Sequence, residues 1–180
     1  MPKVLVPLAQ GCEELEAVTI IDLLRRANIT VITAGLDAEP VIASRGVVLI
    51  PDTTLDKALK QEFDMVVLPG GLPGSNHLNS DLRIQTLLKK MQQQNKYTAA
   101  ICAAPKVLAS AGLLDGKLVT SYPGALEITP TINFIDKPVV RDGLVITSRG
   151  PGTAMDFALE LIKILVGQEI HDKVATGLVR

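Results

Sequence analysis

Short apolar runs alternate with amphipathic segments along the chain, and this alternation predicts strands and helices in turn. Apolar or β-branched runs are typical of buried strands, and they cover residues 3–7, 29–35, 64–68 and 97–101. Apolar residues at helical spacing predict helices over residues 13–27, 81–94, 103–111, 154–166 and 169–179. Fully apolar strands joined by helices are typical of a parallel sheet covered on both faces. The pattern therefore predicts an α/β fold.

Shorter elements are predicted between these segments. Apolar pieces on both sides of Ser44-Arg45-Gly46 indicate a β-excursion, and Asp142-Gly143 between two apolar stretches indicates a hairpin. A short helix is predicted over residues 123–128. Ser80 has a suitable side chain to cap the helix that starts at residue 81. The buried face of that helix is expected to carry Leu82, Leu87, Leu88 and Met91.

Length and composition narrow the class of protein. The chain has 180 residues, 47 % of them apolar and 21 % charged, with a formal net charge of −1; this suits one domain over residues 1–180. The sequence shows neither the basic stripe of a nucleic-acid binder nor the ~18 consecutive apolar residues of a membrane span. The N-terminus also lacks a cleavable signal pattern. We therefore expect a soluble, cytoplasmic protein without membrane or sequence-specific nucleic-acid partners.

The two cysteines, Cys12 and Cys102, are expected to be free thiols, because structural disulfides are rare in a reducing cytosol. The chain has no CxxC pair and no cysteine–histidine cluster at metal-ligand spacing, so no metal site is predicted. Cys12 follows the first strand, where it could act as a resolving thiol or take no part in chemistry.

Cys102 lies where an apolar strand turns directly into a helix, within the stretch YTAAICAAPKVL. Small residues on both sides permit a tight turn similar to the nucleophile turn of hydrolases, with a strained backbone at the cysteine. The unpaired N–H groups of a helix N-terminus favour a thiolate over a thiol. A cysteine that is simply a buried small side chain would have the same local sequence, so both interpretations stay open.

Two further features are candidates for the same site. Pro69-Gly70-Gly71 ends a neighbouring strand, where backbone N–H groups close to a nucleophile would form an oxyanion hole. Glu16 lies in line with an apolar stripe of the first helix, unlike Glu13 and Glu14, which only complement the helix dipole. A carboxyl group in apolar surroundings has a raised pKa. Glu16 is therefore a candidate proton donor or general acid–base near neutral pH.

Histidine is scarce, with only His77 and His171 in the chain. Histidine is a common activator of nucleophilic cysteines, but both residues fall in segments with a polar, surface character. We therefore expect the helix N-terminus and Glu16, rather than a histidine, to activate Cys102.

In combination, several motifs resemble the ThiJ/PfpI superfamily, and within it the Parkinson's-disease protein deglycase/glyoxalase subfamily and its bacterial relatives. The resemblance covers nearly the whole chain. The motifs are GCEELE (11–16), DLLRRA (22–27), SRG (44–46), VLPGG (67–71), AAICAAP (99–105) and TSRGPGT (147–153).

This resemblance implies a flavodoxin-like three-layer sandwich with a mostly parallel sheet and helices on both faces, assembled as a homodimer. It implies that Cys102 is the nucleophile and Glu16 the protonated acid bonded to it. By the same matching, Gly70, Gly71 and Ala103 supply backbone N–H groups near the thiolate. Arg26 and Arg45 match arginines at the dimer interface that reach toward the partner's site.

One position departs from the pattern of several relatives. They carry a histidine near the cysteine, in a segment that matches residues 120–123, and this chain has Tyr122 there. The departure disfavours a Cys–His peptidase or amidase, and Tyr122 could still line the pocket.

The resulting hypothesis is a cofactor-free glyoxalase (a lyase) or protein deglycase (a hydrolase), with a role in the stress response. It would act on methylglyoxal, glyoxal or their early adducts on protein or nucleotide groups, through a Cys102 hemithioacetal with Glu16 as acid–base. The alternative is a sensor of oxidative stress, or a chaperone, that works through a Cys102 sulfinic acid.

Overall fold

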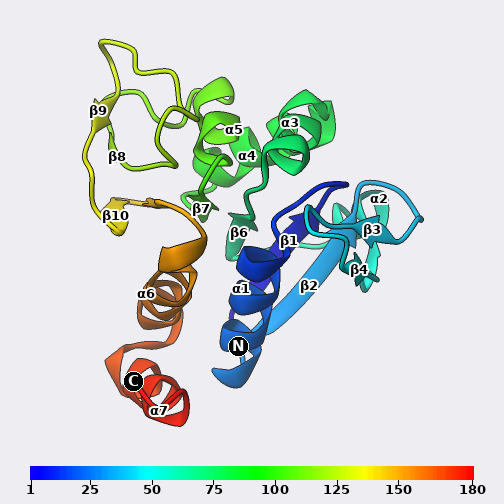
Figure 1. Ribbon diagram of the computed structural model, residues 1–180, viewed down its shortest axis with the longest axis vertical. Helices are drawn as coiled ribbons and strands as arrows, with labels where there is room; N and C mark the ends of the chain where they lie inside the picture. Colours follow the sequence, from blue (N-terminus) through cyan, green and yellow to red (C-terminus); the bar gives the residue numbers. More distant parts are fainter.

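Seven strands form one central sheet in the computed structural model, which describes residues 1–180 (Figure 1). Their order is β10-β11-β7-β6-β1-β2-β5, and only β10 and β11 pair in antiparallel fashion. The strands are β1 (Lys3–Leu8), β2 (Thr30–Gly35), β5 (Thr53–Thr54), β6 (Met65–Leu68), β7 (Tyr97–Ile101), β10 (Val139–Asp142) and β11 (Val145–Ser148). Two small sheets pair β3 (Val41–Ile42) with β4 (Val48–Leu49), and β8 (Leu118–Val119) with β9 (Asn133–Phe134).

Helices cover both faces of this sheet. The helices are α1 (Glu14–Arg26), α2 (Leu55–Ala58), α3 (Leu72–Ser80), α4 (Leu82–Gln93), α5 (Pro105–Ser110), α6 (Ala154–Val166) and α7 (Gln168–Gly177). Side chains alternate between the faces along each strand: Val4 and Val6 pack in the apolar core beneath α1 and α6, whereas Leu5 packs in the core beneath α4 and α5. The predicted flavodoxin-like α/β sandwich with a mostly parallel sheet is confirmed.

The order of the strands predicts a ligand-binding crevice at the carboxyl ends of the central strands. The chain runs outward from β1 through β2 to β5, and then returns to the other side of β1 as β6 and β7. Open α/β sheets bind ligands at the carboxyl ends of the strands where the order reverses. Leu68 of β6 is opposite Ala100 of β7, so Gly70 and Cys102 leave the sheet side by side at these carboxyl ends.

Three local predictions are wrong. Ser80 is the last residue of α3, a helix that the apolar pattern did not indicate, and the cap of α4 is Asp81, whose side chain accepts from Arg83 N–H at 2.9 Å. Leu82 is 80 % exposed, and Ile84 takes its place in the buried face. Residues 123–128 form turns instead of a helix, because Gly124 has a φ of +76°.

None of the helices has the length and apolar character that crossing a bilayer requires.

Candidate active site

Cys102 occupies a strained turn between β7 and α5. Its φ of +63° lies in the left-handed region, which costs a residue other than glycine about 1–3 kcal/mol and is found mostly where function requires it. Two backbone hydrogen bonds hold the turn: Cys102 N–H donates to Ser148 O at 2.9 Å, and Tyr122 N–H donates to Cys102 O at 2.8 Å. The buried neighbours Ala103 and Ala104 leave room for it. The structure therefore has the strained turn predicted from the alanines.

Glu16 projects from the first turn of α1 and is completely buried. Gly70 N–H donates to its Oε2 at 2.8 Å, and its Oε1 has no hydrogen-bond partner. Burial raises the pKa of Glu16 to about 7, against the opposing effect of hydrogen bonds from Cys102 and Gly70. Near neutral pH this carboxyl group thus exchanges a proton readily, as its place in the apolar stripe predicted.

Glycine is required beside this pair. A Cβ atom at Gly70 would lie 2.5 Å from Glu16 Oε2 and 2.6 Å from Cys102 Cβ, so only glycine lets the chain pass close to both side chains. Gly71 has a φ of +88°. Its N–H group and that of Ala103 face the thiol and act to lower its pKa. The Gly70 amide, by contrast, is engaged by Glu16.

Beside a charged Glu16, Cys102 is a protonated thiol rather than a thiolate near neutral pH. Burial, the charge of Glu16 and the hydrogen bond to Glu16 raise the pKa of Cys102 to about 12. This differs from the expectation of a thiolate favoured by the helix N-terminus, because burial and Glu16 outweigh the lowering effect of the Gly71 and Ala103 N–H groups. Two of these three causes depend on Glu16. Protonation of Glu16 removes its charge, so the two groups titrate as a coupled pair.

The Cys102 thiol opens into a cavity of about 390 Å³. We call it the Cys102 cavity. Its lining combines two charged side chains with several apolar ones: Glu13, Arg45, Gly71, Leu72, Cys102, Ala103, Tyr122, Pro123, Gly124, Ala125 and Pro151. A second hollow of about 470 Å³ adjoins it and shares Tyr122, Pro123 and Pro151. The site is thus an open cavity that Cys102 lines, with the Glu16 carboxyl buried behind the thiol.

The turn between β3 and β4 carries Arg45 to this cavity. Ser44 Oγ lies 2.8 Å from Glu13 Oε2 and 2.9 Å from Glu14 Oε2, and Arg45 N–H donates to Glu14 Oε1 at 2.8 Å. Glu13 and Glu14 thus fix the position of the turn. This role was not predicted from the sequence, where both acids were assigned only to complementing the helix dipole. Arg45 is the one arginine of seven whose guanidinium has neither an ion pair nor a hydrogen bond.

Comparison with known proteins identifies the family of this site. The model of the DJ-1/PfpI family matches residues 2–164. The chain belongs to the DJ-1/PfpI family. Protein dj-1beta of Drosophila melanogaster is 47 % identical over 177 residues, which cover 97 % of this chain and 95 % of that protein. The crystal structure of Drosophila DJ-1beta matches with a TM-score of 0.95 and covers 99 % of this chain and 97 % of that chain.

Two further DJ-1/PfpI proteins bear on chemistry. A Caenorhabditis elegans relative, described as the glutathione-independent glyoxalase DJR-1.2, is 35 % identical over 161 residues, which cover 89 % of this chain and 86 % of that protein. A structure described as Toxoplasma gondii DJ-1, oxidized, matches at 38 % identity with a TM-score of 0.95 and covers 99 % of this chain and 98 % of that chain. The resemblance stated from the sequence motifs is confirmed.

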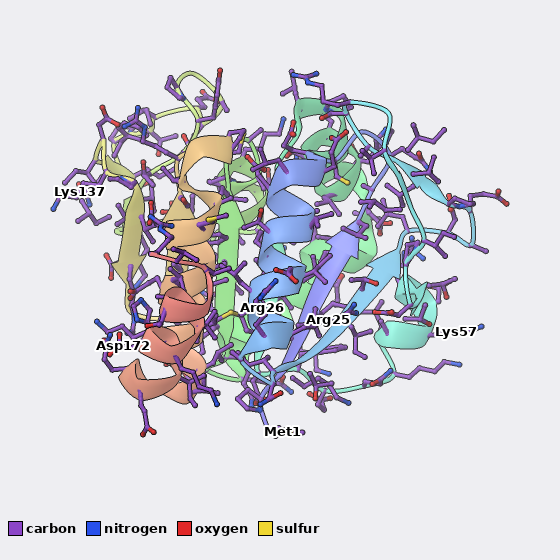
Figure 2. All side chains as sticks on the ribbon, turned by 60° about the horizontal axis from the view of Figure 1, so that its bottom comes forward. Met1, Arg25, Arg26, Lys57, Lys137 and Asp172 are labelled. Atoms are coloured by element: carbon purple, nitrogen blue, oxygen red, sulfur yellow. The ribbon has the colours of Figure 1, made fainter.

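Arg26 lies away from the Cys102 cavity of its own DJ-1/PfpI chain, and its place at a dimer interface, reaching toward the partner's site, stays a prediction. It lies in the last turn of α1, at the opposite end of the helix from Glu16, and its Nε donates to Asp22 Oδ2 at 2.7 Å (Figure 2). Arg45 alone of the predicted pair lines the Cys102 cavity.

The remaining candidates lie outside the cavity. His77 is exposed on α3, and His171 on α7 bonds to Asp172 through Nδ1 at 2.8 Å. Cys12 is a buried free thiol whose pKa burial raises to about 11. No group of three or more histidine, cysteine or acidic side chains is arranged to hold a metal ion. The groups that the structure brings together at the Cys102 site of this DJ-1/PfpI protein are the thiol, Glu16 and backbone amides.

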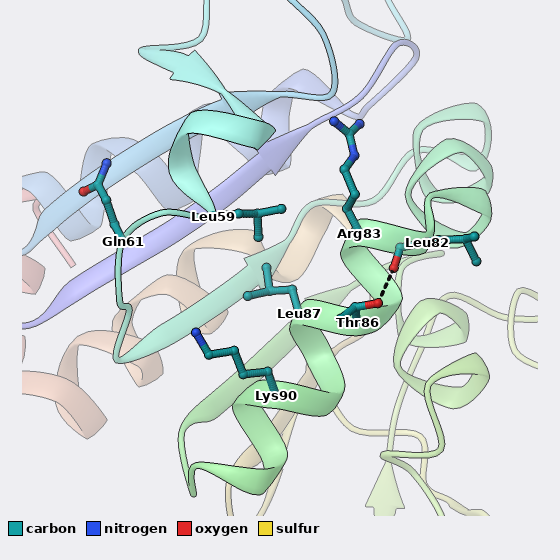
Figure 3. A pocket seen from close by; sticks show the side chains of 7 residues that line it. All are labelled: Leu59, Gln61, Leu82, Arg83, Thr86, Leu87 and Lys90. Carbon is teal, nitrogen blue, oxygen red and sulfur yellow. Dashed lines mark hydrogen bonds between the residues drawn. The ribbon is translucent and has the colours of Figure 1, made fainter.

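Another hollow of about 380 Å³ lies between α4 and the segment after α2 (Figure 3). Its cations are already paired: Arg83 with Asp56 and Asp81, and Lys90 with Glu62. Its lining residues include no cysteine, serine, histidine or acidic side chain; they are Leu59, Gln61, Leu82, Arg83, Thr86, Leu87 and Lys90. This hollow of the DJ-1/PfpI chain therefore has no counterpart of the Cys102–Glu16 pair.

Proposed function

We propose that this chain is a cofactor-free, glutathione-independent glyoxalase that acts on methylglyoxal or glyoxal, and on their early adducts with protein or nucleotide groups. The observation that carries the proposal is the buried Glu16 carboxyl, with a pKa of about 7, beside the Cys102 thiol at the base of an open cavity. The glyoxalase name of the C. elegans relative supports it.

The first step forms a covalent bond to the substrate. The Cys102 sulfur adds to the aldehyde carbon, the carbonyl π electrons move to oxygen, and the thiol proton is passed to that oxygen to give a hemithioacetal. The N–H groups of Gly71 and Ala103, which face the thiol, are in position to stabilise the developing negative charge. Attack requires the thiolate: the Glu16 carboxylate takes up the thiol proton and then gives it to the new alkoxide, so Glu16 is a carboxylate again before the next step.

The second step moves hydrogen between the two carbons. The Glu16 carboxylate removes the proton from the former aldehyde carbon, and the electron pair forms an enediol as the ketone oxygen takes up a proton. Glu16 then returns its proton to the former ketone carbon while the hydroxyl on the former aldehyde carbon loses its proton, which balances the proton taken up by the ketone oxygen, and the product is a 2-hydroxy thioester. A carboxyl group with a pKa of about 7 is suited to both roles near neutral pH.

Hydrolysis completes the cycle. Water attacks the thioester carbon, the carbon–sulfur bond breaks, and the thiol is regenerated with a 2-hydroxy acid such as lactate. The aldehyde carbon is oxidised and the ketone carbon is reduced, so no external oxidant or cofactor takes part. An adduct on an amine or thiol enters the same sequence once that group has left, which gives the deglycase form of the activity.

Lactate formation from methylglyoxal tests this proposal. Cys102→Ser and Glu16→Gln are expected to lower kcat/KM by at least about 100-fold, in line with the loss of a nucleophile or a general acid–base. Cys12→Ser is the control, because Cys12 lies outside the cavity lining. Wild-type rates in both site variants would show that the mechanism is wrong.

The site also fits a second candidate function, a sensor of oxidation or a chaperone regulated by it. A Cys102 sulfinate would accept hydrogen bonds from Gly71 and Ala103 N–H and from protonated Glu16, groups that already face the thiol. The oxidized structure of the T. gondii relative favours this candidate. Intact mass after mild peroxide tests it: Cys102 must gain two oxygens while the methionines stay unmodified.

The proposal includes a homodimer built on α1 and the β3–β4 hairpin. Large apolar side chains are exposed there, with Val18 at 47 %, Val48 at 58 % and Ile50 at 83 %. Val18 and Ile50 line one hollow of about 310 Å³ together with Ile21 and Leu49, and Asp22, Arg25 and Asp52 line the same hollow. The helix and the hairpin with the residues after it thus form one continuous surface of apolar and charged side chains. Exposed apolar surfaces of this kind mark interaction sites.

A further inference from the structure

The Cys102 cavity is larger than the smallest dicarbonyls require. Its volume of about 390 Å³ lies in the range of pockets that hold drug-sized ligands. Methylglyoxal has only five non-hydrogen atoms. Since one water molecule takes ~30 Å³ of liquid, methylglyoxal fills on the order of 100 Å³. Most of the cavity is therefore left for a substituent of the substrate.

The composition of the lining indicates the chemistry of that substituent. Leu72 is 60 % exposed and Tyr122 is 51 % exposed, and Pro123, Ala125 and Pro151 add further apolar surface to the same cavity. Exposed apolar side chains on a cavity wall favour an apolar ligand group, which releases the water that covers them.

Tyr122 is the aromatic side chain of the lining and is placed to receive such a group. Its backbone N–H donates to the carbonyl oxygen of Cys102 at 2.8 Å, so its position is tied directly to the nucleophile. Its ring rests on Gly150, where an added Cβ would lie 3.3 Å from Tyr122 Cδ2. The φ of Gly150 is 170°, an extended conformation open to any residue. The backbone therefore does not require glycine at 150, whereas the ring above it benefits from the missing side chain.

The ring also borders both hollows, because Tyr122 lines the Cys102 cavity and its neighbour. During attack the aldehyde carbon must lie at Cys102 Sγ, and the substituent on the adjacent ketone carbon then extends into the cavity. An aromatic substituent there can stack on, or meet edge-on, the face of the tyrosine ring.

We propose that Tyr122 is a specificity-determining residue and that this site prefers 2-oxoaldehydes with an aromatic or branched apolar substituent over glyoxal. The inference rests on the proposed function. It goes beyond it by naming the substituent that the cavity selects and the side chain that selects it.

The ratio of kcat/KM for phenylglyoxal to kcat/KM for glyoxal tests the inference, because a general loss of activity cancels in the ratio. We expect a wild-type ratio above about 10, since even one methylene in an apolar pocket changes kcat/KM by roughly 10–200-fold. Tyr122→Ala is expected to lower this ratio at least tenfold. Gly150→Ala, which displaces the tyrosine ring, is also expected to lower it. Tyr122→Phe keeps the ring and is expected to keep the ratio.

Binding of the corresponding 2-hydroxy acids gives a readout that needs no turnover. Mandelate and glycolate are titrated into the Cys102→Ser protein and its Tyr122→Ala derivative, with NMR shifts as the signal. We expect mandelate to bind more tightly than glycolate to Cys102→Ser, and we expect Tyr122→Ala to remove this difference. That result supports the inference even if lactate assays disprove the glyoxalase activity. Equal Kd values for the two acids, or a kcat/KM ratio that Tyr122→Ala leaves unchanged, would overturn it.

Discussion

Replacing Glu16 by glutamine should change how stability depends on pH. In the folded protein burial raises the pKa of Glu16 from 4.5 to about 7. Between these values the folded chain keeps a proton that the unfolded chain has released. The native state binds more protons, so this group's contribution to the free energy of unfolding is fully present below pH 4.5 and is lost as pH rises through 7. Glutamine is neutral throughout and cannot show this loss.

The magnitude follows from the two pKa values. One pKa unit corresponds to ~1.4 kcal/mol, so the rise from 4.5 to about 7 corresponds to about 3 kcal/mol. Part of this loss has already occurred at pH 5. We therefore expect the free energy of unfolding of Glu16→Gln, minus that of the wild type, to increase by about 2–3 kcal/mol between pH 5 and pH 8.

Urea unfolding followed by circular dichroism measures this difference, since the chain has no tryptophan. Shared contributions from other carboxyl groups cancel when the two proteins are compared. Glu14→Gln is the matched control on the same helix. The pKa of Glu14 is lowered, although desolvation opposes this, because backbone and Ser44 hydrogen bonds favour its charged form. That group's contribution is present above its usual pKa, so Glu14→Gln should show no such increase between pH 5 and pH 8. A flat difference for Glu16→Gln would refute the raised pKa.

Two further predictions concern packing and assembly. Gly70→Ala should destabilise the fold by about 1–3 kcal/mol and abolish lactate formation, because its Cβ would lie 2.5 Å from Glu16 Oε2 and 2.6 Å from Cys102 Cβ. Urea unfolding and the lactate assay check this prediction. Gly177→Ala is the control, because neither Gly70 nor Gly177 has a positive φ and nothing lies within 4 Å of a Cβ added at Gly177. Ile50→Asp should convert a dimer to monomers in analytical ultracentrifugation, because it places a charge among the exposed apolar side chains of α1 and the hairpin. Leu82→Asp, at a side chain that is 80 % exposed on α4, is the control and should leave the dimer intact. A monomeric wild type would contradict the proposed interface.

The features of the site that depend on neighbouring residues in the chain could be predicted from the sequence. The alanines around Cys102 indicated a tight strained turn, and the turn has a φ of +63°. The apolar stripe through Glu16 indicated a buried carboxyl group, and the residue is fully buried. Both features follow from the spacing of neighbouring residues, which the sequence displays directly.

Other parts depend on contacts between distant segments. The tether from Glu13 and Glu14 to Ser44 spans about thirty residues, and no periodicity reveals it. The thiol pKa could not be foreseen, because it reflects a balance between burial, Glu16 and two amides on separate loops. The missed helix α3 contains glycine, proline and polar residues, which favour turns locally, and its packing against α5 outweighs that preference.

The mass of the protein trapped during turnover tests the central claim most directly. Wild-type protein and the Glu16→Gln and Cys102→Ser variants are mixed with methylglyoxal, quenched in acid and digested at low pH for mass spectrometry, because acid slows the loss of both a hemithioacetal and a thioester. The account predicts that the wild type carries one substrate-derived adduct on the peptide with Cys102. It also predicts that Glu16→Gln accumulates the adduct without releasing lactate, and that Cys102→Ser carries none there. Lactate release from wild-type protein with no adduct at Cys102, or undiminished release from the serine variant, would contradict the claim that Cys102 is the nucleophile.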